Sequence, residues 1–112
     1  MGRFIAAASG FSTLLDRSKG DVEGSLVHPF CVDFDQIARD AGAYFEVPDP
    51  QAQALWRTFI AEVRTASQDC HGAVAQSNGD LLTKSLGEVS QAGAAVVSMG
   101  RRIVAVARAV GL

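Results

Sequence analysis

The sequence predicts an all-α fold organised around a long antiparallel helical hairpin, and two observations support this prediction. Two stretches, at about 49–76 and 80–110, carry apolar or small residues at alternating steps of four and three. That spacing is typical of a helix packed lengthwise on another helix. Only residues 77–79, Ser-Asn-Gly, separate the two stretches, and so short a connection requires neighbouring antiparallel helices.

The two stretches also complement each other in size. If the chain turns back at Asn78, Trp56 faces Gly100 and Phe59 lies near Gly93. Bulky side chains of one helix would then fill the space left by the smallest residues of the other, as in a close-packed interior. We therefore expect both glycines to be buried in the contact. The residues predicted to form it are Ala52, Trp56, Phe59, Val63, Ala66, Cys70 and Ala73 on the first helix, and Leu82, Leu86, Val89, Gly93, Val96, Gly100, Ile103, Ala107 and Val110 on the second.

A shorter helix is expected over about 33–46. Asp33 can cap its free amides, and Gln36 three residues later completes a capping-box pattern. Pro48 ends this helix, because the residue before a proline is pushed out of the helical region.

The two hairpin helices have start signals of their own. Asp49 supplies a cap for the first, and Pro50 is a suitable first-turn residue. Asp80 is expected to cap the second.

The segment 1–32 is predicted to be an irregular N-terminal arm. Its first part, 3–15, has enough apolar residues on one side for a short helix. Its last part, 26–32, is apolar and contains Pro29, which favours an extended conformation at the preceding residue. We therefore expect an extended strap laid on the helices.

Composition indicates a single globular domain, 1–112, with a helical core at 33–112. Hydrophobic residues make up 48% of the chain and charged residues 20%, which is enough apolar material for a core without disulfides or metals. The net charge is −2, and three arginines near the C-terminus have no interleaved aromatic residues, so no nucleic-acid partner is expected. No stretch reaches the ~18 uninterrupted apolar residues of a membrane span.

The early residues do not resemble a cleaved signal peptide, because Ser9 and Gly10 interrupt the apolar run that follows Arg3. A cytoplasmic location is the default expectation. The alternative is export without a cleaved signal peptide.

Two histidines and two cysteines are the residues best suited to chemistry, namely His28, Cys31, Cys70 and His71. Their spacing matches no common zinc motif, and adjacent helical residues point about 100° apart, so Cys70 and His71 would not face one ion. Cys70 lies in the predicted hairpin contact and is interpreted as a small buried residue. Whether Cys31 and Cys70 form a disulfide is left open by the sequence. No catalytic residue, no metal site and no cofactor is predicted.

The end of the hairpin far from its turn carries additional apolar residues beside the predicted contact. The short helix 33–46 spans only ~20 Å, so it covers part of a ~45 Å hairpin. A second chain would cover the rest, most simply in a two-fold dimer that forms a helix bundle. The predicted partner-binding residues are Val97, Met99, Val104 and Val106.

A chain of this length dominated by one antiparallel hairpin resembles the ESAT-like secreted proteins of type VII secretion systems. The resemblance covers about residues 49–112 and lies in the architecture. Those proteins carry Trp-X-Gly in the hairpin turn, where this sequence has Ser-Asn-Gly. They also carry a C-terminal Tyr-x-x-x-Asp/Glu export signal, whereas Tyr44 here is followed four residues later by Pro48. The resemblance implies a secretion-system substrate or partner and assigns no residue a role.

Three functions are therefore considered. The first is a non-enzymatic helical interaction protein that self-associates or pairs with a related helical protein. The second is a small-ligand-binding or sensory module with a pocket near Trp56, Tyr44 and Phe45. The third is an enzyme or metalloprotein that uses His28, Cys31 and Cys70.

Overall fold

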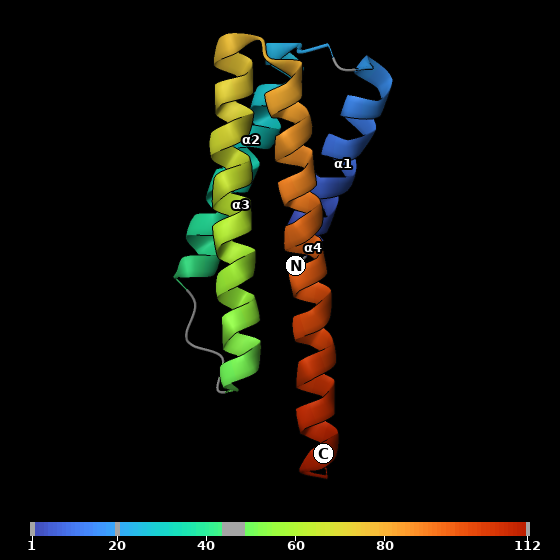
Figure 1. Cartoon of the computed structure of the whole chain (residues 1–112), viewed down its shortest axis with the longest axis vertical. Coiled ribbons are helices and arrows are strands. Elements are labelled where there is room, and N and C mark those ends of the chain that lie inside the picture. Colours follow the sequence, from blue (N-terminus) through green and yellow to red (C-terminus); the bar gives the residue numbers. More distant parts are fainter. Residues whose placement is uncertain (1, 20, 44–48, 112) are drawn as a thin grey trace.

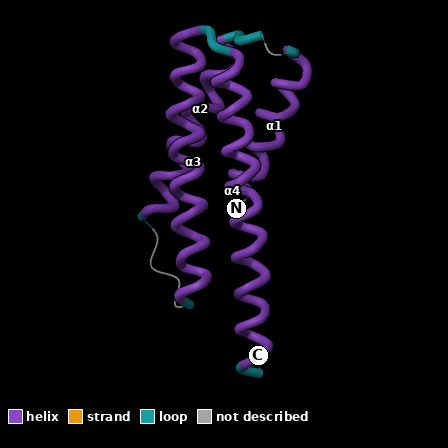
Figure 2. The backbone as a smooth tube through the Cα atoms, in the orientation of Figure 1, coloured by secondary structure: helices purple, strands orange, loops and turns teal. Residues whose placement is uncertain are grey.

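The computed structural model describes residues 2–19, 21–43 and 49–111, and within these ranges it contains four α-helices and no strand (Figures 1 and 2). The predicted all-α fold is confirmed. The helices are α1 (Gly2–Ser18), α2 (Gly24–Gly42), α3 (Pro50–Gln76) and α4 (Gly79–Ala109).

The long hairpin of α3 and α4 has the bounds that the sequence predicts. Asp49 caps α3 by accepting a hydrogen bond from the Ala52 backbone N–H at 3.0 Å, and Pro50 is in the first turn. Ser77 adopts a left-handed conformation, with φ 48°, and reverses the chain. The cap of α4 is Asn78, which accepts from the Leu81 N–H at 3.1 Å, so the prediction of Asp80 as the cap was wrong. Asp80 lies in the first turn, where its charge still favours the helix dipole.

The prediction of an irregular arm at 1–32 was wrong, because most of that segment is helical. The expected short helix at 3–15 extends over the whole of α1. Its apolar side packs against the other helices, and the Phe11 ring meets the Phe34 ring edge to face with centroids 5.3 Å apart. The buried residues of α1 are Phe4, Ala7 and Phe11.

The strap predicted at 26–32 is also helical, and Pro29 lies inside α2. Asp33 is therefore an interior residue rather than a cap, and α2 begins nine residues earlier than the helix predicted at 33–46. Packing explains the difference: Val27, Cys31 and Phe34 follow one another at steps of four and three, and each is at most 2% exposed. Burying this row outweighs the single backbone hydrogen bond that the proline removes. Residues 44–46 of the predicted helix lie outside the described residues.

The four helices form two layers. α2 packs obliquely on α3, and α1 contacts α2 and α4, so the two N-terminal helices cover the end of the α3–α4 hairpin that contains its turn (Figure 1). At the other end, α4 projects past the start of α3 (Figures 1 and 2). The 31 residues of α4 span ~46 Å, which accounts for most of the 51 Å long axis.

The side of α4 that meets α3 differs in part from the predicted one, although Leu82 and Val89 are buried as expected. The residues of α3 are buried as expected, except that Trp56 is only half-buried. On α4, however, Ser85 and Ala92 are fully buried where Leu86 and Gly93 were expected. Steps of three and steps of four from Leu82 both describe a helix face, and the buried Ser85 hydroxyl settles the choice by donating to the Ala66 carbonyl at 2.7 Å. The buried residues of α4 are Leu82, Ser85, Val89, Ala92 and Ala95.

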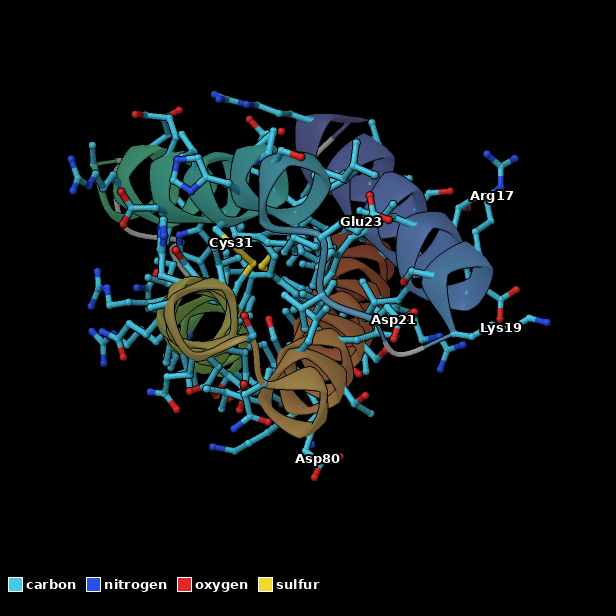
Figure 3. All side chains as sticks on the ribbon, turned by 90° about the horizontal axis from the view of Figure 1, so that it is seen from above. Arg17, Lys19, Asp21, Glu23, Cys31 and Asp80 are labelled. Carbon is cyan, nitrogen blue, oxygen red and sulfur yellow. A yellow bond between two sulfur atoms is a disulfide. The ribbon has the colours of Figure 1, made fainter. Side chains whose placement is uncertain are left out.

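A disulfide joins the two layers. Cys31 of α2 and Cys70 of α3 are bonded, with Sγ atoms 2.09 Å apart and Cα atoms 5.3 Å apart, and both residues are fully buried. The bond lies between α2 and α3 when the bundle is seen from above (Figure 3). Next to it, the buried Ser67 hydroxyl donates to the Cys31 carbonyl at 3.0 Å. The position of α2 on α3 is thus defined by one covalent bond and one hydrogen bond.

Removing this disulfide should lower stability without unfolding the chain. The bond closes a loop of 39 residues, so its loss frees the unfolded chain and costs on the order of 2–4 kcal/mol. We expect Cys31→Ala with Cys70→Ala to lower the urea midpoint. A reducing agent should lower the midpoint of the wild type and leave that of the double variant unchanged. Equal midpoints for wild type and variant under oxidising conditions would contradict the assignment.

Candidate interaction surface

The lower part of α4 presents an apolar face that is mostly exposed, although Val96 at its upper edge is partly buried and packs on the core. Its most exposed members are Val110 at 66%, Val97 at 54%, Val104 at 49% and Ile103 at 44%. With 100° per residue, these side chains and the small residues between them occupy one side of the helix. We call this surface the open face of α4; it consists of Gly93, Val96, Val97, Gly100, Ile103, Val104, Ala107 and Val110.

The four residues predicted to bind a partner divide between two sides of α4. Val97 and Val104 belong to the open face. Met99 and Val106 are half-buried and lie four positions after Ala95 and Arg102, on the side of α4 that faces α3. Their role in binding stays a prediction.

Gly93 and Gly100 are not buried against Trp56, which corrects the expected close packing. A Cβ added to either glycine would meet nothing within 4 Å apart from the helix itself and the adjoining residues. Trp56 instead stacks on Phe59 of its own helix, with ring centroids 5.2 Å apart. The glycines therefore leave two shallow notches in the open face.

Sequence reasoning missed Ile103 and Val110 as surface residues. Both fall on the regular apolar row that was assigned to the hairpin contact. The regularity is real, but among the described residues no helix lies against the lower half of this row. The signal that was available is length, because the helix predicted at 33–46 spans only ~20 Å and cannot cover a ~45 Å hairpin.

Charged residues border the open face without entering it. The side chain of Arg102 points towards α3 and binds Asp49 through two hydrogen bonds of 2.9 and 3.1 Å. This guanidinium, together with the Ala52 N–H, lowers the pKa of Asp49, and the same contact raises the pKa of Arg102. Arg101 and Arg108 are exposed, and residues 89–112 contain no acid.

A second charged group lies between α3 and α4 on the upper half of the hairpin. Lys84 of α4 pairs with Asp69 of α3 at 3.3 Å, and Glu88 adjoins them one turn further along α4. Burial, followed by the Asp69 carboxyl, raises the pKa of Glu88 to about 7. The hydrogen bond from Glu88 lowers the pKa of Asp69. Below about pH 7 the protonated Glu88 carboxyl donates to the Asp69 carboxylate, whereas ionised Glu88 is disfavoured by its burial and by the charge of Asp69.

A small cavity adjoins Trp56, where the ligand-binding hypothesis places its pocket. Its volume is about 100 Å³, and Arg3 and Asp40, which form a 3.3 Å ion pair, lie at its edge. Drug-sized ligands occupy cavities of ~300–1,000 Å³. Tyr44 and Phe45, the other expected lining residues, lie outside the described residues, and the segment 26–32 belongs to α2 rather than covering the cavity.

The residues of the metalloprotein hypothesis come together only in part. His28 and His71 are exposed neighbours on α2 and α3, with ring centroids 5.6 Å apart. Cys31 and Cys70 use their sulfur atoms in the disulfide, so neither offers a thiolate while that bond is intact. Across the described ranges, no three His, Cys, Asp or Glu side chains form a group that could hold a metal ion.

Comparison with known proteins found no matching family model, no matching curated protein and no matching solved structure. Among the helices that the structure describes, none is long and apolar enough to cross a membrane.

The Glu88 group predicts a specific dependence of stability on pH. The folded state keeps a proton on Glu88 up to about pH 7, whereas the unfolded chain releases it near pH 4.5. The free energy of unfolding should therefore fall as the pH rises from 4.5 to 7, and stay lowered above pH 7. Glu88→Gln should remove this fall and exceed the wild type by on the order of 1–3 kcal/mol at pH 8.

Urea titrations at pH 4.5 and pH 8 measure this difference. Asp16→Asn, which removes an exposed acid from α1, is the matched control and should keep the wild-type pH dependence. A Glu88→Gln variant with an unchanged pH dependence would contradict the raised pKa of Glu88.

Proposed function

We propose that this protein is a non-enzymatic helical interaction protein that docks another helix on the open face of α4. The partner is a second copy of the chain or a related helical protein. The observation that supports this proposal is the exposure of four branched apolar residues, 44–66% each, on one side of one helix. Soluble monomers seldom leave a contiguous apolar surface of this kind in water.

The intrinsic helix preference of the projecting segment supports a partner as well. Beyond the Asp49–Arg102 pair, α4 continues for seven residues with no described helix of this chain beside it. This end contains Ile103, Val104 and Val106, whose branched side chains lower helix propensity. A docked helix would bury them and stabilise the projecting turns.

The chemistry of the described side chains supports a binding role rather than catalysis. The two cysteines are bonded to each other. The two acids with shifted pKa values, Asp69 and Glu88, interact with each other and with Lys84 across the hairpin. Ligand binding beside Trp56 is the alternative, and the small volume of that cavity favours it less.

The disulfide supports an oxidising compartment for the mature protein, because buried disulfides persist mainly in secreted or envelope proteins. We therefore favour export without a cleaved signal peptide over the cytoplasmic alternative. Together with the helical hairpin, this agrees with the resemblance to ESAT-like proteins, and the proposal includes a role as a secretion-system substrate or partner.

Introducing charge on the open face should abolish association. Val97→Glu with Val104→Glu places two carboxylates where a partner helix would exclude water, and we expect at least a tenfold loss of affinity. Both positions are about half exposed, so the fold of the single chain should persist, as circular dichroism would show. Sedimentation velocity measures self-association, and quantitative mass spectrometry of proteins that co-purify with the tagged chain from its natural host measures other partners.

Gln91→Glu with Ser98→Glu is the matched control, because it adds the same charge at exposed positions on another side of α4. It should bind like the wild type. Two results together would contradict the proposed function. The wild-type chain would show no self-association at about 500 μM, and it would retain no partner that the Val97/Val104 variant loses.

A further inference from the structure

Six of the eight residues of the open face of α4 alternate between small and branched side chains. Ala107, Gly100 and Gly93 are small and seven residues apart, and Val110, Ile103 and Val96 are branched and also seven apart. The small row is open to solvent at its glycines, and the branched row stands beside it. Such a surface fits a helix that places large side chains opposite the small residues of this one, and small residues opposite its large side chains.

The chain itself carries that complementary surface when its direction is reversed. If a second α4 lies antiparallel, with the two-fold axis level with the Arg101–Arg102 bond, Gly100 of each copy meets Ile103 of the other. In the same register, Gly93 meets Val110, and Ala107 meets the part of Val96 that its own core leaves exposed. A parallel pair would instead set branched residues against branched ones and glycine against glycine, which leaves gaps that cost stability.

Charge is compatible with this pairing. The open face contains no charged residue, and Arg101 and Arg108 lie about 90–110° around the helix from its middle. Their positive charges therefore stay in solvent when two copies meet, and no acid is needed to neutralise them. Val97 and Val104 flank the contact on one side and widen its apolar area.

The second α4 would lie below the layer formed by α1 and α2. Ser85 bonds to Ala66 across the hairpin, so Phe59, seven residues before Ala66, is level with the α4 residue about seven after Ser85, near Gly93. Phe4, at the start of α1, packs on Phe59 with ring centroids 5.0 Å apart. The layer formed by α1 and α2 thus ends close to Gly93, where the proposed second helix would end with Val110.

We propose that the open face of α4 docks the same face of a second copy of this chain, antiparallel, with Gly100 of each copy against Ile103 of the other. This inference rests on the proposed function and names the partner and the register. The paired segments span about 27 Å and a helix is about 10 Å wide, so the dimer buries on the order of 1,000 Å² in total. That area is at the low end for specific interfaces, and we expect a dissociation constant in the micromolar range.

An exchange of two residues tests the register. Gly100→Ile alone sets isoleucine against isoleucine twice in the dimer, and Ile103→Gly alone leaves glycine against glycine twice. Each should weaken the dimer at least tenfold in sedimentation velocity over about 5–500 μM. The double variant, Gly100→Ile with Ile103→Gly, restores one large and one small residue at each contact and should bind within about threefold of the wild type.

Folding of the single chain is measured in the same variants by thermal melting at about 2 μM. Gly100 has open space around it and Ile103 is 44% exposed, so all three variants should melt as folded proteins. A second measurement is oxidative cross-linking of Gly93→Cys mixed with Val110→Cys, with Cys31 and Cys70 retained. The mixed pair should cross-link faster than either variant alone.

The outcomes separate this inference from the proposed function. Suppose that the wild type dimerises and that Val97→Glu with Val104→Glu disrupts the dimer. If the double exchange variant then binds no better than the single variants, the docking face stands and the register is overturned. A wild type that stays monomeric at 500 μM overturns the second copy as the partner. In that case a co-purified helical protein lost with the Val97/Val104 variant would still support the proposed function.

Discussion

The attachment of α2 to α3 through the Cys31–Cys70 disulfide is the constraint on which the rest of the structure depends. The bond holds α2 near the end of α3 that leads into the hairpin turn, and Ser67 adds a hydrogen bond beside it. α1 then packs on α2 and α4, and the aromatic rings of the two N-terminal helices meet in the core there. Because α2 spans only ~28 Å, anchoring it at this end leaves the other end of the hairpin uncovered.

Because that end is uncovered, the proposed docking surface lies on α4. The Asp49–Arg102 pair ties α4 to the start of α3, and the helix beyond it projects from the bundle. Its exposed residues are branched and apolar. Branched side chains lower the intrinsic helix propensity of this segment, and exposure of apolar surface to water is unfavourable. The same segment is well suited to bind a helix, because its glycines admit bulky side chains.

The hairpin could be predicted closely because its signals are local. A cap with a first-turn proline at Asp49 and Pro50, and a polar connection around Asn78, define both helices whatever packs on them. The two N-terminal helices could not be predicted in this way. The local preference of Pro29 against helix was outweighed by burial of Val27, Cys31 and Phe34 and by the disulfide, which join residues distant in the chain.

The sequence by itself determined the all-α class, the two long helices and the existence of a regular apolar row on α4, because the period of side chains around a helix is set by backbone geometry alone. Only the tertiary structure decided which side of α4 meets α3, and therefore that Gly93, Gly100 and Ile103 face outwards. Steps of three and of four from Leu82 satisfy the same helical period. The choice between them depends on the Ser85–Ala66 hydrogen bond and on where α1 and α2 end, and these are contacts between segments that local spacing does not specify.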